Sequence, residues 1–241
     1  MEELAIANLE ARLNGLPVMR KNHGKPTMMP AVGAAMLCAA RLLASSDVAD
    51  TSATTTDPHR ALVVKDVQGR THQPLADAGQ KATILFFVMH DCPLANTYAP
   101  EISRIATEYA TRGVRSFVVY VEESLSAKAA RKHAGEYGFG CPALLDRGQK
   151  LMKFTGATVS PEAVVLGPDN RVLYRGRIDD RLVEFGKRRV TPTRRDLREA
   201  LDEVLAGQPV STPVTKAVGC YLPTLEDRAK DKRSNQSPRT K

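Results

Sequence analysis

The stretch ATILFFVMHDCP, residues 82–93, decides the fold class of this chain. Its first eight residues are apolar except for Thr83, which is the pattern of a central strand buried on both faces. A polar junction of His90, Asp91 and Cys92 follows, and Pro93 then stands where a helix can begin. Beyond it, apolar residues recur at the spacing of one helix face: Ile102, Ile105, Ala106 and Tyr109. The stretch predicts a buried strand that leads through a polar turn into a helix.

Strands and helices alternate on both sides of this junction. The strands are expected at 61–67, 82–89, 114–121, 142–146, 163–166 and 171–178. The helices are expected at 99–112, 126–137, 149–154 and 197–205. Gly-Pro-Asp-Asn, residues 167–170, is a turn signal that makes the last two strands a hairpin. This order predicts an α/β domain with a central mixed β-sheet flanked by helices, whose active site lies at the carboxyl ends of the parallel strands, beside Cys92.

The composition of the chain excludes several classes of protein. The 241 residues are 42% apolar and 26% charged, which excludes wholesale disorder, and four cysteines are too few for a disulfide-dense mini-protein. The formal charge of +8 permits an acidic partner, but the arginine-rich runs lack the interleaved aromatic residues of nucleic-acid binders. His59, His72 and His133 fit no metal-ligand spacing. We therefore expect no metal, no cofactor and no nucleic-acid partner.

The N-terminal part of the chain has the pattern of a targeting segment. The run AVGAAMLCAARLLA, residues 31–44, is apolar except for Gly33 and Arg41, follows several basic residues and precedes small ones. This pattern favours a secretory signal that starts at Met19, with an amphipathic helix packed on the domain as the alternative. If residues 19–45 are a signal peptide, the protein is exported to the periplasm or the extracellular space; otherwise it is cytoplasmic.

These observations predict three regions. Residues 1–60 form the largely flexible signal-like and linker segment, residues 61–207 form the α/β domain, and residues 208–241 form a C-terminal extension that carries Cys220 and ends in a disordered basic tail. No stretch reaches the roughly 18 to 20 apolar residues of a membrane-spanning helix, so we expect no membrane span.

Cys92 is the candidate nucleophile. A helix N-terminus presents unpaired N–H groups and a partial positive charge, and both stabilise a thiolate. His90 would add to this effect when protonated, whereas Asp91 would oppose it. The alternative is a buried structural cysteine, which is common because free cysteines are among the most buried residues. The position at a strand-to-helix junction favours a reactive thiol.

The segment FFVMHDCPLANTYAPEISRI resembles the active site of thioredoxin-fold redoxins, most of all the alkyl hydroperoxide reductase and thiol-specific antioxidant branch. Residues 158–162, TVSPE, followed by AVVL, resemble the cis-proline loop of that family and the strand after it. The similarity spans about residues 61–206. It implies a thioredoxin-like fold, a cis Ser160–Pro161 bond facing Cys92, and a thiol-based redox activity.

The chain departs from the family at two positions. Ala95 stands where thioredoxins carry a second cysteine, and Met89 stands where peroxiredoxins carry a threonine. A site with a single cysteine needs another thiol to resolve its oxidised or mixed-disulfide form. Cys220, on the C-terminal extension, is our hypothesis for that thiol. Cys141, an external thiol, and no internal disulfide at all remain alternatives.

Basic residues cluster near the end of the predicted domain. If the hairpin turn is centred near Pro168 and Asp169, the returning strand brings Gly176 and Arg177 opposite Pro161. We therefore expect the rim of the Cys92 pocket to hold Arg177, Asp179, Asp180 and Arg181. A guanidinium there would stabilise a thiolate or bind an anionic substrate. Ion pairs on a solvated helix flank are the alternative for the rest of the cluster.

The leading interpretation is a thiol-dependent oxidoreductase. Cys92 attacks a peroxide or a protein disulfide, Cys220 resolves the product, and an external thiol reductant recycles the protein. The expected site comprises Cys92, Cys220, Pro161, Pro93 and His90, with Ser160 and Arg177 binding the substrate. One alternative is a copper-binding redoxin-fold chaperone, although Asn96 stands where its second cysteine is needed. The other alternative is a thioredoxin-fold module that binds partners without turnover.

Overall fold

The computed structural model describes residues 62–76 and 79–227. The predictions for residues 1–60 and for the end of the C-terminal tail lie outside the described residues. No helix in the described part of the chain is long and apolar enough to cross a membrane.

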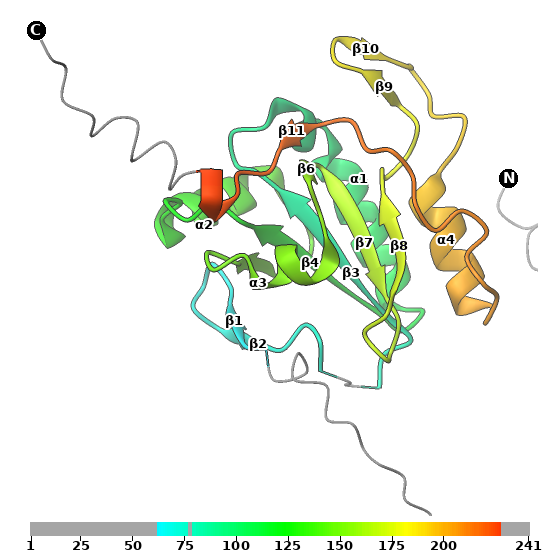
Figure 1. Cartoon of the computed structure of the whole chain (residues 1–241), viewed down its shortest axis with the longest axis horizontal. Helices are drawn as coiled ribbons and strands as arrows, with labels where there is room; N and C mark the ends of the chain where they lie inside the picture. Colours follow the sequence, from blue (N-terminus) through cyan, green and yellow to red (C-terminus); the bar gives the residue numbers. More distant parts are fainter. Residues whose placement is uncertain (1–61, 77–78, 228–241) are drawn as a thin grey trace, which may run out of the picture. The chain divides into compact units, whose positions relative to one another are not determined.

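The core is a five-stranded mixed sheet, as predicted (Figure 1). Its strands, in spatial order, are β5 (Ala143–Leu145), β4 (Val114–Tyr120), β3 (Ala82–Val88), β7 (Glu162–Leu166) and β8 (Val172–Gly176). The strands β3, β4 and β5 run parallel, whereas β7 and β8 run antiparallel to their neighbours. Every residue of β3 is buried, which is why its sequence is apolar almost throughout.

Helices cover the two faces of the sheet unequally. The helices are α1 (Pro93–Ala110), α2 (Ala127–Tyr137), α3 (Lys150–Thr155) and α4 (Asp196–Leu205). Apolar residues of α1, α2 and α4 pack in one cluster with Ile84, Phe86 and Val88 of β3. The alternate β3 residues, Leu85 and Phe87, pack with α3 on the other face. The apolar side chains of β3 thus pack into both hydrophobic clusters, one on each face of the sheet.

Local signals account for the helix ends. The Ser126 side chain accepts a hydrogen bond from the N–H of Ala129 and caps α2, and Gly138 ends it with a φ of 59°. The helix α1 begins at Pro93, six residues before the predicted start at Ala99, because its first turn is set by the proline rather than by apolar spacing.

Three short strand pairs surround the sheet in the described part of the chain: β1 (Val64–Lys65) with β2 (Thr71–His72), β9 (Leu182–Glu184) with β10 (Lys187–Arg188), and β6 (Val159–Ser160) with β11 (Cys220–Tyr221). Of the predicted strand 61–67, only Val64–Lys65 forms a strand, β1, which pairs with β2. The strands that the sequence pattern missed are β2, β6, β9, β10 and β11. Elements of two or three residues are too short to show a period of two, so periodicity cannot reveal them.

Candidate active site

Cys92 and Cys220 form a disulfide, with their Cα atoms 6.2 Å apart. The bond joins the N-terminus of α1 to β11 across 128 residues of sequence. Cys141 is a free cysteine, partly buried, and burial raises the pKa of its thiol to about 12. A thiol with that pKa is protonated at neutral pH and is a poor nucleophile. The hypothesis that Cys92 pairs with Cys220 rather than with Cys141 is confirmed.

The turn after β3 places Cys92. Its N–H donates to the carbonyl of Met89 at 3.3 Å, and its own carbonyl accepts the N–H of Asn96 at 3.1 Å. Cys92 is the N-cap residue of α1, with Pro93 behind it, and its side chain does not cap the helix. The sulfur is bonded to Cys220 instead, and Cys92 is only 1% exposed.

The loop at Pro161 lies directly against Cys92. The Ser160–Pro161 peptide bond is cis, as the family resemblance implies. The Ser160 carbonyl oxygen lies 3.2 Å from Cys92 Sγ, and the Ser160 hydroxyl accepts the N–H of Met89 at 2.8 Å. Ser160 thus ties the loop to the turn that carries Cys92. The structure brings together Cys92, Cys220, Ser160 and the cis-proline loop.

The C-terminal extension delivers Cys220 as part of a strand. Residues 213–225, here called the strap, run along β8 and then across the Pro161 loop (Figure 1). Within the strap, β11 pairs antiparallel with β6, so that Cys220 lies opposite Ser160 and Tyr221 opposite Val159. The Leu222 N–H adds a hydrogen bond to the Thr158 carbonyl at 2.9 Å. The strap occupies the backbone edge next to the redox cysteine.

Gln149 anchors the far end of the strap. Its side-chain amide donates to the Pro223 carbonyl at 2.6 Å and accepts the N–H of Leu225 at 3.0 Å. The same amide nitrogen lies 3.3 Å from the Val121 carbonyl, just beyond the end of β4. Leu222 is buried in the apolar cluster under α3. The strap is therefore held by side-chain contacts as well as by the disulfide.

His90 is bound by a buried carboxylate that the sequence analysis missed. Glu122 Oε1 accepts both the backbone N–H and the Nδ1–H of His90, each at 2.9 Å. The Glu122 side chain is 5% exposed, and its Oε2 has no hydrogen-bond partner among the described residues. Glu122 follows the end of β4, next to β3, so its position at the carboxyl edge of two parallel strands was the available signal.

Polar side chains from α1 and α2 meet behind His90. Tyr120 donates to His133 Nδ1 at 2.6 Å, and His133 Nε2 donates to Asn96 Oδ1 at 2.9 Å. The Asn96 amide nitrogen lies 3.5 Å from the His90 carbonyl. Burial, together with the nearby His90, lowers the pKa of His133, which favours the neutral imidazole that this arrangement needs. Asn96, which stands where the copper chaperones need a second cysteine, thus helps to orient the turn that carries His90 and Cys92.

One cluster near the disulfide has the composition of a cation site. Ligand atoms of His90, Asp91 and Glu122 lie within 4.8 Å of one another. The Glu122 oxygen in question already accepts two hydrogen bonds from His90, and Asp91 is largely exposed. The oxygen that Glu122 offers to this cluster is therefore already engaged by His90, and neither Cys92 nor Cys220 belongs to the cluster.

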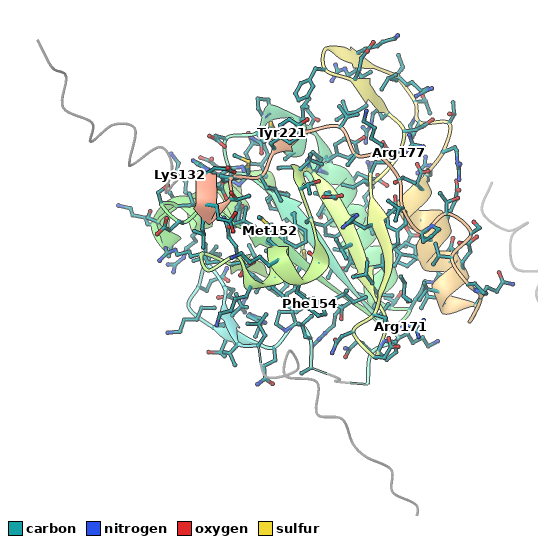
Figure 2. The ribbon with its side chains drawn as sticks, in the orientation of Figure 1. Lys132, Met152, Phe154, Arg171, Arg177 and Tyr221 are labelled. Carbon is teal, nitrogen blue, oxygen red and sulfur yellow. A yellow bond between two sulfur atoms is a disulfide. The ribbon has the colours of Figure 1, made fainter. Side chains whose placement is uncertain are left out.

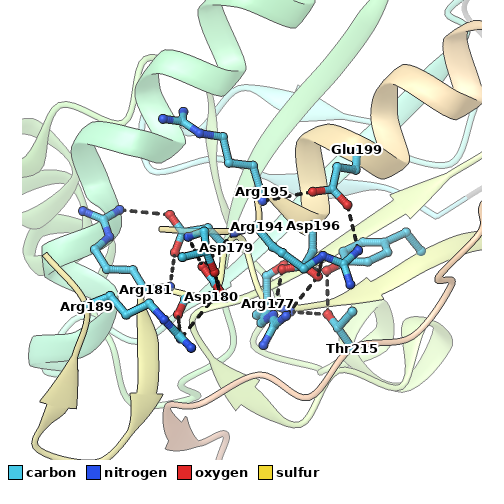
Figure 3. A network of polar contacts seen from close by, with 12 residues as sticks. Arg177, Asp179, Asp180, Arg181, Arg189, Arg194, Arg195, Asp196, Glu199 and Thr215 are labelled. Carbon is cyan, nitrogen blue, oxygen red and sulfur yellow. Dashed lines mark hydrogen bonds and ion pairs between the residues drawn. The ribbon is translucent and has the colours of Figure 1, made fainter. Parts of the chain in front are cut away.

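The expected position of Arg177 opposite Pro161 is wrong. The sheet register pairs Ala163 with Gly176, so Arg177 falls opposite Glu162 and not opposite Pro161. An irregularity between Val165 and Leu166 shifts the register, and no turn rule reveals such a shift. The Arg177 guanidinium instead binds both oxygens of Asp196, at 2.7 and 3.1 Å (Figure 3).

The neighbouring charges of this cluster are also paired internally. Asp179 accepts the hydroxyl of Tyr98 on α1 and pairs with Arg181, whose guanidinium lies 4.8 Å from the centre of the Tyr98 ring. Asp180 accepts the N–H groups of Thr193 and Arg194. These contacts fix the segment that follows β8, and they leave none of the carboxylates free to act on Cys92.

Comparisons with known proteins agree with this geometry. Residues 54–184 match the family model described as Redoxin, which is more than half of the chain. A hypothetical protein from Sinorhizobium meliloti is 26% identical, with 66% of this chain and 88% of that chain covered and a TM-score of 0.57. An uncharacterized conserved protein from Geobacillus kaustophilus is 25% identical, with coverages of 68% and 88% and a TM-score of 0.58. No curated protein matches.

Proposed function

Because the chain belongs to the redoxin family of thiol-dependent oxidoreductases, we propose that it exchanges disulfides with polypeptide substrates through Cys92 and Cys220. The observation that carries this proposal is the Cys92–Cys220 disulfide beside the Pro161 loop. Two cysteines that alternate between a disulfide and two thiols can take up or deliver two electrons without a cofactor.

The reaction runs in two exchange steps. In the reduced protein, the Cys92 thiolate attacks one sulfur of a substrate disulfide, and the other substrate sulfur leaves as a thiolate. The Cys220 thiolate then attacks Cys92 Sγ, which breaks the mixed disulfide and releases the second substrate thiolate. The substrate disulfide is reduced by two electrons and the Cys92–Cys220 disulfide is formed. An external dithiol then reduces the Cys92–Cys220 disulfide by the same two exchange steps, becomes a disulfide itself and regenerates both thiols.

Several residues support this chemistry by position. The N–H groups of the first turn of α1 stabilise a Cys92 thiolate, and Pro93 starts that turn without needing a hydrogen-bond partner of its own. Glu122 and Asn96 fix the backbone at His90. Ser160 and Pro161 hold the opposing loop. We therefore assign Cys92 as nucleophile, Cys220 as resolving cysteine, and the others as positioning residues.

A disulfide substrate fits the site better than a peroxide does. The atoms of the loop that contact Cys92 and Met89 are the Ser160 carbonyl and hydroxyl, and the hydroxyl is engaged by the Met89 N–H. Met89 itself offers no hydroxyl that could orient a peroxide. The backbone edge of β6, in contrast, already pairs with the extended chain of β11, which is the way an extended polypeptide is bound.

Single-cysteine variants test the proposal. The reduced protein is mixed with an aromatic disulfide whose thiolate product is coloured, and the reaction is followed in parallel with hydrogen peroxide. We expect rapid release of two thiolates per molecule from the parent and from the Cys141→Ser control. Cys92→Ser should lose the rapid reaction, and Cys220→Ser should stop at a mixed disulfide on Cys92 that mass spectrometry detects. An unchanged rate in Cys92→Ser, or a faster reaction with peroxide than with the disulfide, would contradict the proposal.

The disulfide also bears on the cellular compartment of the protein. Disulfides persist in oxidising compartments and are rare in the cytosol. Together with the signal-like residues 19–45, this supports export of the protein. Cell fractionation with N-terminal sequencing tests this assignment, and an uncleaved protein in the cytosol would exclude it.

A further inference from the structure

A basic hairpin projects beside the redox site. Residues 181–195, here called the basic hairpin, contain β9 and β10 and connect the end of β8 to α4 (Figure 1). Asp180 holds its base, because it accepts the N–H groups of Thr193 at 2.7 Å and Arg194 at 3.0 Å. The Arg189 N–H closes the hairpin on the Arg181 carbonyl at 2.8 Å. The hairpin is therefore a fixed feature of the fold, although its two strands are short.

The basic hairpin carries much more positive than negative charge. Its charged residues are Arg181, Lys187, Arg188, Arg189, Arg194 and Arg195, against the single acid Glu184. A hollow of about 350 Å³ lies on it, lined by Arg181, Arg188, Arg189 and Val190 and by no carboxylate.

The arginines that line the hollow differ in their partners: Arg181 pairs with Asp179, and Arg189 pairs with Asp180. Arg188 has no carboxylate partner in the part of the chain that the structure describes. Guanidinium groups bind carboxylates with paired, charge-assisted hydrogen bonds. The hollow is thus complementary to acidic groups.

Apolar side chains stand beside these charges. Phe185 is 65% exposed and Val190 is 100% exposed, both on the basic hairpin, and Tyr221 next to Cys220 is 83% exposed. Arginine and exposed aromatic residues are the types that are enriched in protein–protein interfaces. A small inorganic anion would make no use of Phe185 or Val190, whereas a polypeptide would contact both.

The basic hairpin lies close to the disulfide. At its base, Arg181 stacks on Tyr98, which is six residues beyond Cys92 on α1. The register of β7 and β8 pairs Gly176, five residues before the basic hairpin, with Ala163, two residues after Pro161. In Figure 1 the strands β9, β10 and β11 all lie at the same end of the sheet. A chain that reacts at Cys92–Cys220 can therefore reach the basic hairpin.

We propose that the basic hairpin docks an acidic segment of the polypeptide whose thiols or disulfide react with Cys92 and Cys220. The carboxylates of that segment enter the hollow between Arg181, Arg188 and Arg189, and its apolar residues contact Phe185 and Val190. This inference rests on the proposed exchange function and adds the chemistry of the partner. The hairpin thereby selects among substrates that present equivalent sulfur atoms.

Two synthetic dithiol peptides test the proposal. Both contain the same pair of cysteines separated by two residues; one is flanked by Asp and Glu and the other by Lys. Each peptide reduces the Cys92–Cys220 disulfide and becomes oxidised itself, and the reaction is followed by acid quenching, alkylation and mass spectrometry. At low ionic strength we expect the acidic peptide to react at least about five-fold faster, and the difference to shrink as salt is added. Equal rates would overturn the proposal.

A charge reversal on the basic hairpin tests whether the preference for the acidic peptide arises there. Arg188→Glu should abolish the preference for the acidic peptide. The matched control is Arg171→Glu, an exposed arginine at the turn between β7 and β8, at the opposite end of the sheet from Tyr221 (Figure 2). This variant changes the net charge equally and should keep the preference. Retention of the preference in Arg188→Glu, or its loss in Arg171→Glu, would refute docking at the basic hairpin.

Two further measurements distinguish failure of the docking proposal from failure of the proposed exchange function. Dithiothreitol, which is uncharged, should reduce the disulfide at the same rate in the parent and in Arg188→Glu. If dithiothreitol fails to reduce the parent reversibly, the proposed exchange function fails rather than the docking. Inorganic phosphate should slow the acidic peptide no more than chloride does at equal ionic strength. Stronger inhibition by phosphate would identify the hollow as a site for small anions and would overturn the docking proposal.

Discussion

Gly219 sets how closely the strap approaches the redox loop. A Cβ atom at this position would overlap the carbonyl group of Ser160 and would meet Pro161 N at 3.2 Å. Both neighbours are backbone atoms at the cis-proline loop, so they cannot move aside as a flexible side chain would. The absence of a side chain at Gly219 therefore permits β11 to pair with β6 and Cys220 to reach Cys92.

Gly219→Ala should separate the two cysteines without disturbing the core. We expect the reduced variant to close the Cys92–Cys220 disulfide at least about ten-fold more slowly than the parent, since a disulfide needs its Cα atoms within a narrow range of distances. Quenched alkylation during reoxidation measures the rate. Ala217→Gly, two residues earlier in the strap, is the control that should reoxidise normally. A parental rate in Gly219→Ala would show that the strap approaches by another route.

At the scale of elements, a single carboxylate holds the small β1–β2 unit together. Asp66 accepts the N–H groups of Gln68 and Arg70 at 2.9 Å, and it pairs with the side chains of Arg70 and His72 at 2.8 Å. Burial alone would raise the pKa of Asp66, but the hydrogen bonds from His72 and Arg70 outweigh it and lower the pKa from 3.8 to about 2. The folded state therefore prefers the ionised carboxylate.

This shift predicts an acid-sensitive contribution to stability. Because the pKa is lower in the folded state, the contribution is present above about pH 4 and is lost as the pH falls towards 2. Asp66→Asn should lower the free energy of unfolding at pH 7 and should flatten its decline between pH 4 and pH 2. Urea unfolding at a series of pH values measures both effects. An unchanged slope below pH 4 would show that Asp66 does not carry this dependence.

At the scale of the whole molecule, the disulfide closes most of the domain into one loop. The linked residues lie 128 positions apart, and the loop contains every helix and strand from α1 to α4. Cross-linking such a loop restricts the unfolded chain, and disulfides of this kind typically stabilise a protein by about 2–4 kcal/mol. The redox state of the site and the stability of the domain are therefore coupled.

Reduction should lower the free energy of unfolding by about 2–4 kcal/mol. Guanidinium unfolding of the oxidised protein, with and without a dithiol, measures the difference. Cys220→Ser should unfold like the reduced parent under both conditions, and Cys141→Ser should behave like the parent. Equal stability of the oxidised and reduced forms would mean that the strap and its side-chain contacts alone restrict the chain.

The sequence by itself determined the elements and the reactive junction. The continuous apolar run of β3 requires a strand buried on both faces, and the structure confirms it. Ser126 and Gly138 mark the ends of α2, because caps are made by residues close in sequence. The position of Cys92 between a buried strand and Pro93 likewise depends on neighbours in the chain. Such features are local, so a single sequence is enough to find them.

Tertiary structure alone decided which distant groups meet. The sequence left Cys220 and Cys141 as alternatives, and the pairing of β11 with β6 chose Cys220. The contact of Glu122 with His90 depends on two parallel strands ending at the same edge. Arg177 reached Asp196 instead of the Cys92 loop because one irregularity shifted the register of β7 and β8. A shift of one residue changes every partner across a sheet, and the free energies that fix it come from packing of the whole domain rather than from any local pattern.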